Sequence, residues 1–75
     1  MSDWQEVSEG HYRFEDDPWT MYLQVDESGA MLEIYYNAAH VSTNNWGPGT
    51  VARSGVEWCT KQAVKLLEAE KKKRT

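Results

Sequence analysis

Cysteine, proline and long apolar runs are all scarce in this 75-residue chain, and each scarcity excludes a class of protein. A single cysteine, Cys59, cannot form an internal disulfide, whereas a secreted domain this small usually carries several bridges. We therefore expect a cytoplasmic, reducing environment. No apolar run approaches the roughly 20 residues that cross a bilayer, and the acidic N-terminus differs from a signal peptide, so no membrane contact is expected.

Motifs of catalysis and metal binding are also lacking. His11, His40 and Cys59 are too scattered for metal-ligand spacing, and no glycine-rich phosphate loop, nucleophile elbow or zinc-protease helix occurs. Cys59 falls on the core-facing flank of a predicted helix, which predicts an inert buried thiol. The sequence therefore predicts a protein that is not an enzyme and has no metal or other cofactor.

Charge is distributed unevenly along the chain. Residues 1–52 hold nine acids and one base, Arg13, for a net charge of −8, whereas residues 53–75 hold seven bases and three acids, for +4. An acidic segment attracts basic surfaces and repels phosphate, and the basic run does the opposite. The alternative is that the acids only keep the domain soluble and the bases complement a helix dipole.

Period-two alternation of apolar side chains predicts three strands, at residues 10–15, 19–25 and 30–36. The polar connection between the last two, which ends in Gly29, predicts a hairpin. Residues 39–43 could form a short fourth strand. Otherwise residues 37–53 form a long loop rich in turn residues, and we treat that loop as a candidate site.

A helix is predicted over residues 55–72. Ser54 and Glu57 match a capping box, and the final basic residues suit the negative end of a helix dipole. The predicted core stripe is Val56, Thr60, Ala63 and Leu67, which leaves Trp58 on the opposite, exposed side. The expected structure is a single domain, residues 1–75, of the α+β class: an antiparallel meander of three or four strands with one C-terminal helix packed on one face.

Aromatic residues are the most informative set, because a core of this size does not accommodate all nine of them. Large rings left on a surface are typical of protein interfaces. Together with acids near the predicted strands, they define a candidate partner-binding set: Trp58, Trp46, Tyr22, Tyr35, Glu15, Asp16, Asp17 and Glu33. The alternative for Trp46 and Trp58 is packing against their own loop or helix flank.

In size, acidity and the pattern of a short meander closed by one capped helix, the chain resembles small accessory proteins of phages and mobile elements of the anti-CRISPR kind. The resemblance covers the acidic, aromatic segment 10–36 and the helix start at residues 54–57. It implies a stoichiometric inhibitor that occupies a surface of a larger protein or a nucleoprotein complex. An acidic face would then compete for a basic channel, although the basic C-terminus departs from pure charge mimicry.

Two other functions stay open. The first is an accessory protein that contacts nucleic acid through Lys65, Lys71, Lys72, Lys73 and Arg74, with aromatic rings stacking on bases. The acidic surroundings of those rings make this the weaker hypothesis. The second is a homodimer formed through the Trp58 side of the helix, which would account for that ring without a foreign partner.

Overall fold

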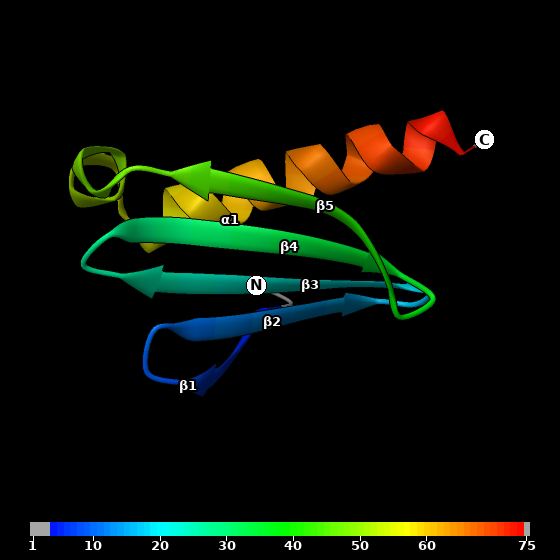
Figure 1. The fold of residues 1–75 in the computed structure, drawn as a ribbon, viewed down its shortest axis with the longest axis horizontal. Helices are drawn as coiled ribbons and strands as arrows, with labels where there is room; N and C mark the ends of the chain where they lie inside the picture. Colours follow the sequence, from blue (N-terminus) through cyan, green and yellow to red (C-terminus); the bar gives the residue numbers. More distant parts are fainter. Residues whose placement is uncertain (1–3, 75) are drawn as a thin grey trace.

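The computed structural model describes residues 4–74, so Asp3 of the acidic segment lies outside the described part. Five strands, β1 (Trp4–Ser8), β2 (His11–Asp16), β3 (Trp19–Asp26), β4 (Gly29–Tyr36) and β5 (Ala39–Trp46), precede one helix, α1 (Pro48–Lys73). The strands form one antiparallel sheet in the order β1-β2-β3-β4-β5, and α1 lies on one side of it (Figure 1). The α+β fold with a meander and a C-terminal helix is confirmed.

Residues 4–74 form five strands, where three or four were expected. The strands predicted at 10–15, 19–25 and 30–36 correspond to β2, β3 and β4, and the short strand at 39–43 is the eight-residue β5. The additional strand is β1, an edge strand in which only Trp4 is even half-buried. The alternative to that strand, a long loop at 37–53, is therefore wrong, because β5 and the start of α1 occupy most of this segment.

Two-residue turns join all five strands. The turn between β4 and β5 has positive φ at both Asn37 and Ala38, 50° and 66°, which matches the type I′ turn that suits the twist of a hairpin. The turn before β4 ends at Gly29, whose φ of 123° is rarely adopted by other residues. Short turns of this kind fix the register of neighbouring strands.

The core lies between the sheet and α1. Its largest fully buried side chains come from the inward positions of β3 and β4 and from one helix stripe: Met21, Leu23, Leu32, Ile34, Cys59 and Leu67. The helix stripe is centred on Cys59, Ala63 and Leu67, and Val56 and Thr60 of the expected stripe are only half-buried beside it. Burial of the Cys59 side chain, expected from the sequence, is confirmed.

Helix α1 begins at Pro48, earlier than the predicted residue 55. Proline suits the first helical position, because its missing N–H has no partner there and its φ is already helical. At Gly55 the backbone leaves the helical region, with φ 82° and ψ 168°, so α1 consists of two helical segments joined at a kink. The second segment begins close to the predicted start at residue 55, and a short first segment precedes it.

Candidate functional site

The face of the sheet opposite α1 carries a row of polar and aromatic side chains. Pairing places Arg13 opposite Tyr22, Tyr22 opposite Glu33, and Glu33 opposite Thr43. The neighbouring row includes Tyr35 opposite His40. Because side chains on one face of a sheet line up across paired strands, these residues form one surface. We call the set of Arg13, Tyr22, Glu33, Tyr35, His40 and Thr43 the outer-face cluster.

Aromatic contacts organise the centre of this cluster. The rings of Tyr22 and Tyr35 have centroids 5.6 Å apart at an interplanar angle of 83°, and Tyr35 lies 5.5 Å from the His40 ring at 74°. Both arrangements are edge-to-face, which aromatic quadrupoles favour. His40 Nε2 and Thr43 Oγ1 are hydrogen-bonded at 2.7 Å. The rings are therefore held in place although Tyr22 is 42% exposed.

A carboxylate supports the tyrosine pair. The Tyr35 hydroxyl donates a hydrogen bond to Glu33 Oε2 at 3.1 Å. This hydrogen bond raises the pKa of Tyr35 above its ordinary value, with smaller contributions from desolvation and from the negative charges nearby. At neutral pH the cluster thus presents a neutral hydroxyl next to a carboxylate.

Arginine and glutamate border the cluster on β2. Arg13 forms an ion pair with Glu15, and the Arg13 Nε atom is buried with no hydrogen-bond partner among residues 4–74. A shallow hollow of about 640 Å³ lies at the end of this face, and its lining includes Asp17, Tyr22 and Tyr35. The structure thus brings Glu15, Asp17, Tyr22, Glu33 and Tyr35 of the candidate set to one face.

Asp16 does not belong to that face. It forms an ion pair and hydrogen bond with Lys71 of α1, on the helix side of the sheet. The hydrogen bond from Lys71 to Asp16 is the main reason why the pKa of Lys71 is raised, partly opposed by desolvation. Asp16 therefore links the β2–β3 turn to the end of the helix.

Trp46 and Trp58 form a separate pair. Their ring centroids are 6.1 Å apart at 74°, and both side chains are half-buried against the core. The expectation that Trp58 lies on the exposed side of the helix is wrong, because the core stripe is rotated toward Cys59 and places Trp58 on its flank. The alternative, in which each ring packs within the molecule, holds for both tryptophans.

The basic run at the end of α1 folds back on the molecule. Lys71 contacts Asp16 and Glu68, Lys73 pairs with Glu70, and the Arg74 guanidinium lies 4.6 Å from the Tyr36 ring centroid and 5.3 Å from that of Trp19. Lys72 also makes an interaction. Lys65 makes no ion pair with the part of the chain that the structure describes. Most of the basic residues proposed to contact nucleic acid thus already interact with other residues of the protein.

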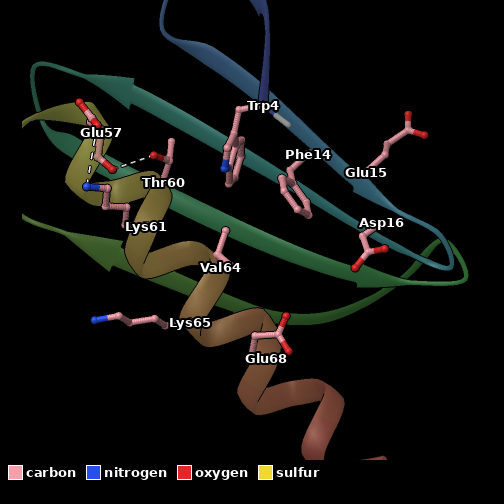
Figure 2. Close-up of a pocket in the computed structure, with 10 residues that line it drawn as sticks. All are labelled: Trp4, Phe14, Glu15, Asp16, Glu57, Thr60, Lys61, Val64, Lys65 and Glu68. Carbon is pink, nitrogen blue, oxygen red and sulfur yellow. Dashed lines mark hydrogen bonds and ion pairs between the residues drawn. The ribbon is translucent and has the colours of Figure 1, made fainter. Parts of the chain in front are cut away.

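A groove lies on the helix side, between the β1–β2 end of the sheet and α1, with a volume of about 840 Å³. Figure 2 shows Trp4 and Phe14 projecting from the strands toward the helix, where Val64 faces them. The Trp4 and Phe14 rings are 5.2 Å apart. Charged side chains surround this apolar floor: Asp16, Glu57, Lys61, Lys65 and Glu68.

Several residues of these surfaces were not among the sequence candidates. Alternation places His40 on the face opposite Val41, but a single histidine in the sequence does not indicate a binding surface. Its pairing with Tyr35 in the sheet is what places it in the outer-face cluster. Trp4 has a weak sequence signal, because β1 is short and its alternation is interrupted by a bulge. Neither surface could therefore be assembled without the strand register.

No family model, curated protein or solved structure matches the chain. Among residues 4–74, no helix has both the length and the apolar character that spanning a membrane requires. The same residues contain no group of histidine, cysteine and carboxylate side chains that could hold a metal ion. The fold, a five-stranded meander backed by one helix, and the outer-face cluster are the basis for a functional proposal.

Proposed function

We propose that this protein is a non-enzymatic protein-binding module and that the outer-face cluster contacts its partner. The observation that carries the proposal is the Tyr22–Tyr35–His40 cluster on a sheet face that α1 leaves uncovered (Figure 1). Tyrosine presents a large contact area and loses little conformational entropy on binding, which is why it is enriched in binding surfaces. Arg13, Glu15 and Glu33 add charges that fix the orientation of a partner.

The finer hypothesis is a phage-type stoichiometric inhibitor of a host defence nucleoprotein complex. Support comes from charge: residues 4–46, which form the sheet and its turns, hold eight acids and one base, Arg13. The basic end of α1 contacts Asp16, Trp19 and Tyr36 on the helix side of the sheet, so these bases lie on the side opposite the outer-face cluster. An acidic surface of this kind would compete for a basic channel in a reducing, intracellular setting.

Affinity capture on the immobilised protein, from nuclease-treated lysate at moderate salt, tests the proposal. Tyr22→Ala removes the exposed ring, whereas Lys65→Ala changes an exposed residue on α1 and serves as the matched control. A stoichiometric protein that is retained by the wild type and by Lys65→Ala but lost with Tyr22→Ala supports binding through the outer face. A partner retained equally by all three proteins would show that the surface is wrong.

Inhibition is tested on the captured partner by titration. A stoichiometric inhibitor should abolish the partner's activity at about one equivalent, and substoichiometric loss would indicate catalysis instead. Contact with nucleic acid through the basic end of α1 is tested by binding of an oligonucleotide at low salt. Binding that depends on Lys72 and Lys73 but not on Tyr22 would favour that second function.

A further inference from the structure

The two edges of the sheet differ in how they are protected against pairing with a further strand. An edge strand presents a row of main-chain N–H and C=O groups that have no partner within the sheet. β1 is five residues long, carries Glu6 and contains a bulge, and all three features discourage pairing. β5 at the other edge is eight residues long and has no acid, lysine, arginine or proline (Figure 1). Its register is irregular only near Val41, so residues 42–46 form a regular edge without such protection.

The strand register shows which main-chain groups of β5 point to the free edge. The carbonyl oxygen of Trp46 lies beside Gly29 of β4, so Trp46 directs its main-chain groups toward β4. Along an antiparallel strand, successive residues bond alternately to one side and to the other. Asn44 therefore also bonds toward β4, whereas Thr43 and Asn45 direct their N–H and C=O groups to the free edge. Counting along β4 from the two-residue turn before β5 gives the same directions.

Charge and symmetry favour a second copy of this chain as the strand that pairs with β5. The chain carries a net charge of −4, and all acids of residues 4–46 precede β5, so β5 is the strand along which two copies meet without opposing carboxylates. Antiparallel pairing centred on Asn44 places this residue opposite its own copy. It also places Thr43 opposite Asn45 of the other copy. Both of these residues are exposed and direct their main-chain groups to the edge, so each such pair can exchange both hydrogen bonds.

Two tryptophans beside this edge supply apolar contact that main-chain pairing lacks. Trp46 ends β5, and its ring lies 6.1 Å from that of Trp58 on the helix side of the sheet, with both side chains half-buried. The pairing centred on Asn44 sets Trp46 opposite Ser42 of the other copy, a small residue that leaves room for the ring. Because α1 packs chiefly on β4 and β3, the two helices would lie at least three strand spacings, about 14 Å, apart. Packed helices lie about 8–10 Å apart, so large side chains are needed to fill the space between them.

From these observations we propose that the protein forms a symmetric dimer in which residues 42–46 of β5 pair antiparallel with the same residues of a second copy. The two sheets join into one, and the Trp46 and Trp58 rings of both copies lie between the two helices. The two-fold axis is perpendicular to the joined sheet, so both outer-face clusters lie on the same face. The interface uses the edge of β5 and neither tyrosine ring of that cluster. Failure of the dimer would therefore leave the proposed function of the cluster unaffected, and the converse also holds.

Sedimentation equilibrium at micromolar to millimolar concentrations measures the dimer. The mass should rise with concentration from the 8.7 kDa of one chain toward twice that value. Amide hydrogen exchange followed by NMR locates the interface. Exchange of the Thr43 and Asn45 N–H groups should slow as the dimer forms, because these groups become hydrogen-bonded, and exchange in β1 at the other edge should stay the same.

Two pairs of variants test the edge. Thr43→Pro removes an N–H that points to the free edge, a change that an edge strand tolerates in the monomer, and Glu6→Pro places a proline on the other edge strand. Asn44→Lys sets two ammonium groups opposite one another across the two-fold axis, and Gln5→Lys makes the same change on β1. Each β5 variant should weaken dimerisation at least about tenfold, and each β1 variant should change it less than about twofold.

A dimer that is weakened in both β5 variants and kept in both β1 variants, with slower exchange at Thr43 and Asn45, is the expected result. Asn44→Lys and the exchange measurement on the wild type keep the test valid even if Thr43→Pro unfolds the protein. A wild type that stays monomeric at millimolar concentration would overturn the proposal, as would a dimer that persists in a folded β5 variant. A dimer that Trp58→Ala abolishes while both β5 variants retain it would also overturn the proposal, because the interface would then lie on the helix.

Discussion

Alanine at Gly29 should destabilise the protein more than alanine at Gly49 or Gly55. Gly29 has a φ of 123°, and a Cβ added to it would lie 2.1 Å from the Trp46 carbonyl oxygen and 3.1 Å from the Gly47 carbonyl carbon. The unfavourable φ costs about 1–2 kcal/mol. Moving β5 away to relieve the overlap adds about 1–3 kcal/mol, so the expected loss of unfolding free energy is about 3 kcal/mol.

The other two glycines separate these contributions. Gly55 has a φ of 82° but open space around its added Cβ, so Gly55→Ala should cost only the conformational part, about 1 kcal/mol. Gly49 has neither a positive φ nor a neighbour within 4 Å, and Gly49→Ala should stabilise the protein by about 0.4–1 kcal/mol. Each variant thus differs from the next by one physical factor.

Urea unfolding followed by tryptophan fluorescence measures all three variants against the wild type. The expected order of stability is Gly49→Ala, wild type, Gly55→Ala and Gly29→Ala, with the same m-value throughout. If Gly29→Ala were as stable as Gly55→Ala, the Trp46 carbonyl would not lie against Gly29, and the described pairing of β4 and β5 at that end would be incorrect.

Three more predictions concern titratable groups. Burial raises the pKa of the Cys59 thiol, so a disulfide reagent should label the native protein slowly and the urea-unfolded protein at once; rapid native labelling would contradict its burial. Glu33→Gln should lower the pKa of Tyr35 toward its ordinary value in an NMR titration, because the hydrogen bond to the carboxylate is its main cause, and an unchanged pKa would rule that cause out. Because the pKa of Lys71 is raised in the folded state, its pair with Asp16 stabilises the fold below about pH 10.4, and this stabilisation is lost as the pH rises through the folded pKa. The urea concentration at the unfolding midpoint should therefore fall at alkaline pH in the wild type, and Asp16→Asn should remove this fall.

The sequence predicts the strands that have one buried and one exposed face. In β3, Trp19, Met21 and Leu23 are buried and alternate with more exposed residues, so the period-two pattern is clear. At the edges this pattern fades. β5 carries Ser42 and Asn44 at half-buried positions, because the helix packs chiefly on β3 and β4 and a polar side chain is tolerated there.

The helix shows a different limit of sequence analysis. Ser54 and Glu57 match the sequence pattern of a helix start, but the chain is already helical from Pro48. Gly55 therefore lies at a kink within α1 and not at its beginning. The exposure of Trp58 was misjudged because periodicity gives the relative angles of side chains and not the absolute rotation of the helix. That rotation depends on contacts from elsewhere in the chain, including the Trp46 ring at the end of β5.

The candidate site was predictable only in part. Tyr22 and Tyr35 were both candidates, and the alternation of β3 and β4 with the hairpin between them is enough to place the two rings on one sheet face. Asp16 and Asp17 were both included among the acids near the predicted strands, but neighbouring residues of an extended chain point in opposite directions, and Asp16 contacts Lys71 on the helix side. The groove depends on how far the helix extends over the sheet, which no local pattern encodes.

The strand order β1-β2-β3-β4-β5 has a kinetic consequence. Every pairing joins segments that are adjacent in the chain through a two-residue turn, so the contact order is low for a protein with so much sheet. Each hairpin closes a short loop and loses little chain entropy, and the sheet can extend outward by one strand at a time. Folding should therefore be fast compared with that of β proteins whose strands pair across long stretches of sequence.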